Sequence, residues 1–223
     1  MRRDETASTR FTDRREAGAE LATRLLHYQG QNVVVLVLPR GGVPVGYEVA
    51  RRLDALLDVF VVRKLGMPGH REYAIGAIAS GGVQFLDAEL LQRYAVPEAA
   101  VDAIAREERA ELERRERAYR QGTAITPLRD RTVVLVDDGL ATGSTMKAAI
   151  AAVRLHHPAR IVVAVPIGPV STCRELAALA DEVICARTPE PFTAVGQWYD
   201  DFSETTDAEV RELLTRRSPP TDE

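Results

Sequence analysis

The sequence has few cysteines and no long apolar run. Only Cys173 and Cys185 occur among 223 residues, with no CxxC pair and no histidine pair nearby. This scarcity argues against a structural zinc site and a disulfide-stapled fold, and it suits a reducing compartment. The longest strongly apolar run, Val33 to Leu38, is far shorter than the ~20 residues of a membrane-spanning helix.

An excess of charge of one sign is also missing. The chain has 29 Lys and Arg against 33 Asp and Glu, a net charge of -4. This balance gives no general attraction to nucleic acid or to an anionic membrane, so an anionic ligand needs a local site. The first residues mix acids with bases and lack the apolar core of a secretory signal. We therefore expect a cytoplasmic protein with no membrane partner and no nucleic-acid partner.

What the sequence does contain is a regular alternation of apolar, β-branched segments with helical patterns. Continuous apolar segments of this kind are typical of strands buried on both faces. Their alternation with helices predicts an α/β, doubly wound fold, with a mainly parallel five-stranded sheet and helices on both faces. The expected strands are residues 33–38, 58–62, 133–136, 161–166 and 182–186.

Other segments are expected as additions to one core domain at residues 31–187. A hairpin (75–79 with 83–86) and a long, densely charged helix (97–121) form an insertion at about 75–121. The remaining expectations are flanking segments at 9–30 and 188–217, and disordered ends at 1–8 and 218–223.

Three polar or glycine-rich segments follow predicted strands, at residues 39–42, 63–69 and 137–145. Ligands of open α/β sheets bind beyond the carboxyl ends of the strands. We therefore expect the three segments to converge on one site.

The most informative stretch, residues 133–145, reads VVLVDDGLATGST. Asp137 and Asp138 end a buried strand, where carboxylates are costly without donors or a metal. A vicinal diol suits two such carboxylates, which together can help to hold Mg²⁺ through water. Residues 141–145 then begin a helix, whose free N–H groups suit a phosphate. The alternative is a capped helix after solvated aspartates, but the whole constellation favours a ligand site.

This stretch resembles the signature of type I phosphoribosyltransferases, which bind 5-phosphoribosyl 1-pyrophosphate (PRPP). The resemblance implies that Asp137 and Asp138 hold the ribose hydroxyls, directly or through Mg²⁺. It also implies that the following loop binds the 5-phosphate. The residues of that loop are Ala141, Thr142, Gly143, Ser144 and Thr145.

Two further segments stand where this family would place them. PRGG, residues 39–42, resembles its pyrophosphate loop, which often contains a non-proline cis peptide, here expected to involve a glycine. VVRK, residues 61–64, resembles a basic strand end that contacts PRPP. The alternatives are an ordinary glycine turn and a pair of surface cations. The implied pyrophosphate-binding residues are Arg40, Gly41, Gly42, Arg63 and Lys64.

The family also has a mobile flap, which would correspond to residues 66–76, and a small hood over the base, built from terminal segments. FTAVGQWYDDF, residues 192–202, loosely resembles the hood. It offers Phe192 and Trp198 as base-stacking rings and Asp200 or Asp201 as an acid near the metal. A packed tryptophan with surface acids is the alternative.

Together these features favour a Mg²⁺-dependent phosphoribosyltransferase, a glycosyltransferase of nucleotide salvage. It would transfer ribose 5-phosphate from PRPP to a nucleobase or related nitrogen acceptor and release pyrophosphate. Ala141 in the phosphate loop resembles the adenine-type members of the family, because the members that use oxopurines commonly carry an acid in this loop. A non-catalytic PRPP-sensing regulator on the same fold is the alternative. A homodimer is in keeping with similar proteins, and no side chain is assigned as general acid or base.

Overall fold

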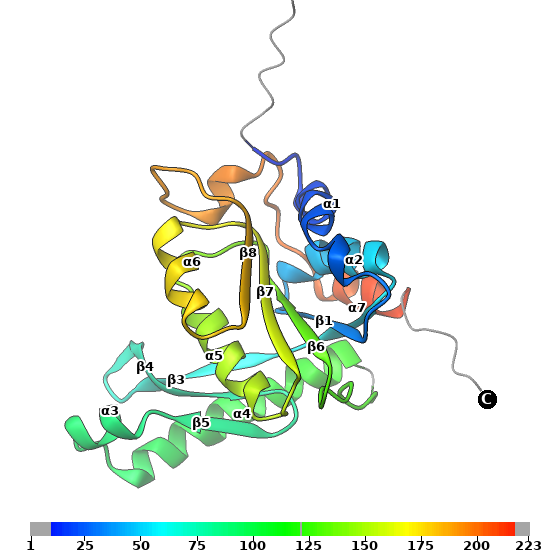
Figure 1. Cartoon of the computed structure of the whole chain (residues 1–223). Helices are drawn as coiled ribbons and strands as arrows, with labels where there is room; N and C mark the ends of the chain where they lie inside the picture. Colours follow the sequence, from blue (N-terminus) through cyan, green and yellow to red (C-terminus); the bar gives the residue numbers. More distant parts are fainter. Residues whose placement is uncertain (1–9, 121, 217–223) are drawn as a thin grey trace, which may run out of the picture.

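The computed structural model describes residues 10–120 and 122–216, apart from the side chains of residues 71 and 72. The ends predicted to be disordered, residues 1–8 and 218–223, lie outside this description. Within it, a central sheet is covered by helices on both faces, and a smaller sheet with a long helix stands at one side (Figure 1).

The central sheet has five strands in the order β2-β1-β6-β7-β8, and every neighbouring pair is parallel. This confirms the predicted doubly wound sheet. In β1, Val34 and Leu36 enter one apolar cluster while Val35 and Val37 enter the other, as expected of a strand buried on both faces. The strands are β1 Val33–Val37, β2 Leu56–Val59, β6 Thr132–Val136, β7 Arg160–Ile167 and β8 Glu182–Arg187.

Helices on opposite faces complete the two apolar clusters (Figure 1). One face is covered by α5 and α6, and the other by α1 and α2, with α7 beside α2. A short 3-10 helix, Leu26–Tyr28, follows α1. The helices are α1 Arg14–Arg24, α2 Gly42–Leu53, α5 Ser144–Arg154, α6 Val170–Ala177 and α7 Asp207–Thr215.

The chain leaves the central sheet earlier than the predicted strand 58–62. The N–H of Phe60 still donates to the carbonyl of Val37 at 2.9 Å, but that of Val61 donates to Ser80 Oγ at 2.9 Å. The chain thereby crosses to a second, antiparallel sheet, where β3 (Val62–Met67) pairs with β4 (His70–Ala79). The glycine-rich segment 66–76, expected as a loop, is therefore mostly strand.

The predicted insertion is present in the structure. Strand β5 (Val83–Leu86) pairs with β4, and a long helix α4 (Glu98–Arg120) covers β3. A short helix α3 (Ala88–Arg93), which the sequence pattern did not predict, links them. Only one stripe of α4 is buried, which explains its dense charge elsewhere; the stripe is Val101, Ala105, Leu112 and Tyr119.

The small hood is built from both ends of the described chain. The N–H of Phe11 donates to the carbonyl of Trp198 at 2.8 Å, and that of Asp200 donates back to the carbonyl of Phe11 at 2.8 Å. A 3-10 helix, Val195–Trp198, precedes this pairing. The exact domain boundaries stay a prediction. No helix in the described part of the chain is both long and apolar enough to cross a membrane.

Candidate active site

The predicted site lies where the winding of the sheet reverses. Strands β1 and β6 are neighbours, yet β1 leads into α2 on one face and β6 leads into α5 on the other. The loops that follow them, residues 38–41 and 137–143, lie at the carboxyl ends of the two strands (Figure 1). Such a switch point is the usual ligand position in open α/β sheets.

Close approach of backbones brings the PRGG loop against the acid pair. The N–H of Leu38 donates to the carbonyl of Val136 at 2.9 Å. A Cβ added to Gly41 would lie 2.0 Å from Asp138 Oδ2, and one added to Gly42 would lie 2.8 Å from the carbonyl oxygen of Val136. At position 42 only glycine fits against this backbone oxygen, whereas a Cβ at position 41 would require the Asp138 carboxylate to move. The predicted pyrophosphate loop and ribose acids are therefore in contact.

A non-proline cis peptide is present in this loop, between Pro39 and Arg40. The expectation that glycine would be one of its two residues was wrong, since the bond lies one residue before Gly41. The glycines instead provide the close approach to the acids.

The two acids are largely withdrawn from solvent and close to one another. The N–H of Asp138 donates to Asp137 Oδ1 at 2.9 Å. Burial, and then the neighbouring charge of Asp138, raises the pKa of Asp137 well above its usual range. Burial also raises the pKa of Asp138, while Arg14 opposes this rise. Such a pair gains from a ligand that supplies hydroxyl donors or positive charge.

Two residues that the sequence analysis did not select contact Asp138. Arg14, the first residue of α1, donates from Nε to Asp138 Oδ2 at 2.8 Å. Tyr199 donates its hydroxyl to the backbone carbonyl of Asp138 at 2.6 Å. Both come from the hood, which therefore sits directly over the end of β6. No local spacing in the sequence indicates either contact.

The predicted phosphate loop has an open N-terminal helix end. Gly143 precedes α5 in a left-handed conformation with φ of 70°, which favours glycine. The hydroxyls of Thr142 and Ser144 are 3.0 Å apart, and Ala141, Thr142 and Thr145 are exposed. From α6, Thr172 donates its hydroxyl to the carbonyl of Ala141 at 2.9 Å. Free N–H groups at this helix end suit an anion.

The cationic side chains predicted to contact pyrophosphate face other parts of the protein in this structure. Arg63 donates from Nε to Glu108 of α4 at 2.7 Å. Lys64 is exposed and lines a cavity of about 360 Å³ between β3 and α4. Arg40 forms ion pairs with Glu204 and Asp207. Their contact with pyrophosphate stays a prediction and requires these side chains to change partners.

The predicted base-stacking rings lie together in the hood. Phe192 and Trp198 are nearly parallel, with centroids 6.5 Å apart and an interplanar angle of 16°. Their segment reaches the site through Val195, which a Cβ on Gly139 would meet at 2.6 Å. The indole nitrogen of Trp198 is buried without a hydrogen-bond partner.

The two candidate metal acids of the hood differ in their surroundings. Asp201 accepts from the N–H of Ser203 at 2.9 Å, which lowers its pKa, and Asp200 lies 4.0 Å from Arg10. The structure gives neither a contact with Asp137 or Asp138, so a metal-binding role for them stays a prediction.

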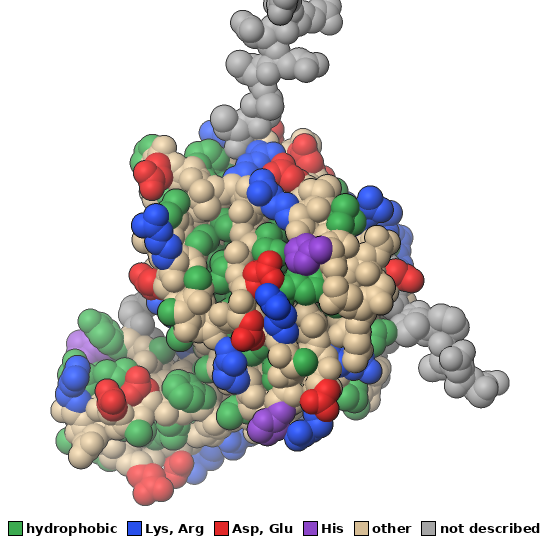
Figure 2. Space-filling model, in the orientation of Figure 1, with side chains coloured by type: hydrophobic (Ala, Val, Ile, Leu, Met, Phe, Trp, Pro, Cys, Tyr) green, Lys and Arg blue, Asp and Glu red, His purple; other side chains and the backbone are tan. Residues whose placement is uncertain are grey.

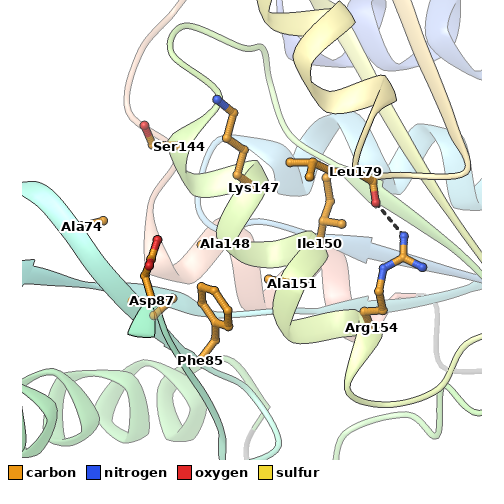
Figure 3. Close-up of a pocket in the computed structure, with 12 residues that line it drawn as sticks. Ala74, Phe85, Asp87, Ser144, Lys147, Ala148, Ile150, Ala151, Arg154 and Leu179 are labelled. Atoms are coloured by element: carbon orange, nitrogen blue, oxygen red, sulfur yellow. Dashed lines mark hydrogen bonds between the residues drawn. The ribbon is translucent and has the colours of Figure 1, made fainter. Parts of the chain in front are cut away.

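A second cavity, of about 510 Å³, begins at the phosphate loop and runs along α5 (Figure 3). Phe85 and Asp87 stand on its β5 side, and Ala148 and Ala151 of α5 on the other (Figure 3). Its polar rim is already bonded within the protein. These bonds join Lys147 to Glu175, Arg154 to the Leu179 carbonyl, and Asp87 to the N–H of Leu90. The switch point, rather than this apolar cavity, therefore offers the donors and acids that a sugar phosphate needs.

The acid pair suits Mg²⁺ only as part of its ligand set. Mg²⁺ commonly takes one or two carboxylates and completes its shell with water and substrate phosphates. Among the residues that the structure describes, no group of three or more His, Cys, Asp or Glu is placed to hold a metal. Asp137 and Asp138 would thus hold the ion together with oxygens of a phosphorylated substrate.

The face of the molecule in Figure 2 has no large patch of one charge sign. Figure 2 shows acidic and basic side chains interspersed on the face in view, in keeping with the net charge of -4. An anionic ligand is therefore attracted by the loops at the switch point rather than by a large basic patch.

Comparison with known proteins identifies the family. A model of the phosphoribosyl transferase domain matches residues 68–194, more than half of the chain. Proteins from two strains of Mycobacterium tuberculosis, both provisionally described as phosphoribosyl transferases, are 49% identical over 206 residues, which cover 92% of this chain. Those residues cover 46% of the relatives, so the chain spans about half their length.

The crystal structure of the protein TT1426 from Thermus thermophilus is similar throughout. It superposes with a TM-score of 0.85 at 45% identity, over 93% of this chain and 98% of that one. The chain belongs to the phosphoribosyl transferase domain family.

Proposed function

We propose that the protein catalyses Mg²⁺-dependent transfer of the ribose 5-phosphate of PRPP to a nucleobase or related nitrogen acceptor. The observation that carries this proposal is the contact of Gly41 and Gly42 with Asp137 and Asp138 at the switch point. The open N-terminus of α5 stands next to this contact in the chain. Two anion-binding loops flanking two acids match the chemistry of a sugar with a phosphate at each end.

Each element has a separate task in this proposal. Asp137 and Asp138 accept hydrogen bonds from the ribose 2- and 3-hydroxyls, and the loop 141–145 binds the 5-phosphate. The backbone of residues 40–42 faces the pyrophosphate, with Arg40, Arg63 and Lys64 as candidate cations. Bound Mg²⁺ would neutralise charge on the leaving pyrophosphate.

The transfer breaks one bond and forms one at the anomeric carbon. The lone pair of the acceptor nitrogen forms the new bond to C1, while the C1–O bond breaks and its electron pair leaves on pyrophosphate. The acceptor nitrogen gives up its proton to water. The sugar becomes cationic in the transition state, so the carboxylates beside it and the donors around the leaving group supply electrostatic stabilisation. Positioning of the two substrates supplies the remainder.

We place the acceptor under the hood. Phe192 and Trp198 present ring faces there, and the buried indole N–H of Trp198 lacks a protein partner. The absence of an acid at Ala141 favours an acceptor of the adenine type over an oxopurine. Nucleotide salvage, a cytoplasmic location and a homodimer complete the proposal.

A panel of nucleobases incubated with PRPP and Mg²⁺ tests the activity. We expect release of pyrophosphate with at least one base, and no release when that base is omitted. Asp137→Asn with Asp138→Asn should abolish the release. PRPP binding without turnover across the whole panel would contradict the enzymatic proposal and favour a PRPP-sensing regulator.

A further inference from the structure

Arg14 connects the hood to the acid pair across 124 positions of sequence. Its Nε donates to Asp138 Oδ2 at 2.8 Å, and its Nη1 donates to the carbonyl oxygen of Ser203 at 2.7 Å. The side chains of Arg14 and Asp138 are only 11% and 16% exposed. A pair so withdrawn from water differs from an exposed ion pair, which contributes little.

Several groups fix the position of this guanidinium. Its central carbon lies 4.0 Å from the centroid of the Phe202 ring and 5.9 Å from that of Tyr199. Asp13 caps α1 by accepting the N–H groups of Arg15 and Glu16 at 2.8 Å, which sets where Arg14 leaves the helix. The Arg14 side chain is therefore held in place by the hood independently of any ligand.

The guanidinium stands where a cation on the acid pair would feel its charge. It already compensates the negative charge of Asp138, and a divalent ion bound to the same carboxylate would lie within a few ångströms of it. At such separations like charges repel strongly in a partly buried site. PRPP reverses this balance, because it carries its own phosphate charges and oxygen ligands to the metal.

We propose that Arg14 is a positioning residue that withholds Asp137 and Asp138 from a divalent cation until PRPP is present. In the free protein it holds the Asp138 carboxylate at the end of β6, ready for a ribose hydroxyl. The metal then enters with PRPP rather than before it. This inference rests on the proposed function, and it adds to it an order of binding set by one residue outside the sequence motif.

Mn²⁺ alone, followed by its electron paramagnetic resonance signal, tests this on the full chain without PRPP. Arg14→Gln should bind Mn²⁺ at least about tenfold more tightly than the parent, because it removes a charge beside the carboxylates. The matched control is Arg15→Gln, which removes the same charge from the exposed neighbouring position and should leave the affinity unchanged. Adding Asp138→Asn to Arg14→Gln should abolish the gain.

Two further measurements guard against a merely structural effect. Arg14→Lys keeps the charge and should bind Mn²⁺ as weakly as the parent, which a simple loosening of the hood would not reproduce. Equal Mn²⁺ affinity in Arg14→Gln and the parent would overturn the inference. Strong binding of Mn²⁺ alone by the parent would also overturn it. That measurement does not depend on whether any variant folds.

The outcome is separable from that of the proposed function. The Mn²⁺ titration contains no PRPP and no base, so it reports on Arg14 alone. Failure of the parent to bind PRPP with Mg²⁺ would defeat the proposed function while leaving the measured exclusion of the cation intact. A gain in Arg14→Gln equal to that in Arg15→Gln would defeat only the role of Arg14.

Discussion

At the scale of single residues, the acid pair lowers the stability of the free protein. Asp137 is partly buried beside Asp138, and its pKa is raised mainly by that burial. An acid whose folded pKa lies above its unfolded value destabilises the fold as pH rises through the interval between the two. Residues kept at such a cost are typical of a functional site.

Asp137→Asn should therefore stabilise the free protein at neutral pH. The amide can still accept the N–H of Asp138, now 2.9 Å from Oδ1, but carries no charge to bury. We expect a gain on the order of 1 kcal/mol in the free energy of unfolding, or a few degrees in melting temperature. The gain should shrink as the pH is lowered from 7 towards 4, because the parent acid becomes protonated. Urea unfolding at several pH values measures this, and a loss of stability at pH 7 would contradict it.

A second prediction for a single residue concerns Gly41 and the binding of PRPP. A methyl group there would meet the Asp138 carboxylate at 2.0 Å, and a side-chain end can move away at modest cost. Gly41→Ala should thus keep the fold, displace Asp138 and weaken PRPP binding at least about tenfold, the loss of one charge-assisted contact. Calorimetric titration with PRPP and Mg²⁺ measures the change. In an Asp138→Ala background the same substitution should weaken PRPP binding much less. An equally large loss of affinity there would show that the added methyl group clashes with another residue.

The sequence motif was informative for residues that are close together in the chain. It pointed to Asp137, Asp138 and the loop after them because strand, acids and small residues follow one another within thirteen positions. Arg14 and Tyr199 contact Asp138 through the folding of the two ends, and no spacing in the sequence predicts such contacts. The ion pair of Arg63 with Glu108 was missed for the same reason.

At the scale of elements, a buried ion pair joins the inserted helix to the central sheet. Arg120, at the end of α4, lies 2.8 Å from Asp58 of β2, and the two side chains are 7% and 11% exposed. Asp58 also accepts the N–H groups of Val59 and Thr126 at 2.7 and 2.8 Å. This cluster joins three parts of the chain, which are β2, the end of α4 and the segment around Thr126.

Arg120→Met should destabilise the fold by about 3 kcal/mol, because it leaves the Asp58 carboxylate buried without its cation. Arg117→Met is the control, since that side chain is 72% exposed in its contact with Glu113 and should cost little. Both variants should keep PRPP binding, as the partners of both side chains lie outside the candidate site. Thermal unfolding measures the difference, and equal stability of the two variants would contradict this account.

The inner strands β1, β6 and β7 were predictable because each is a continuous apolar run buried on both faces, whereas the edge strand β2 includes Asp58 and was expected at 58–62. The second sheet was harder. Strand β3 exposes Lys64 and contains Gly66, so its sequence resembles a loop, and its strand conformation depends on pairing with β4. Short helices such as α3 and α7 were missed because they gain their stability from tertiary contacts more than from local pattern.

At the scale of the whole molecule, the two ends of the described part of the chain meet at Asp138 and complete the candidate site. The hood brings Arg14 and Tyr199 to the acid that follows β6. The Mycobacterium relatives share this chain over about half their length, so the phosphoribosyl transferase unit is joined to further sequence in those proteins.

The most direct test is the melting temperature with and without PRPP and Mg²⁺. A ligand at about 100 times its dissociation constant stabilises by about 2.7 kcal/mol, which for a chain of this size is a rise of roughly 5–10 °C. The parent should show this rise, and Asp137→Ala with Asp138→Ala should lose it while remaining folded. An unchanged melting temperature in the parent at saturating PRPP and Mg²⁺ would contradict the account.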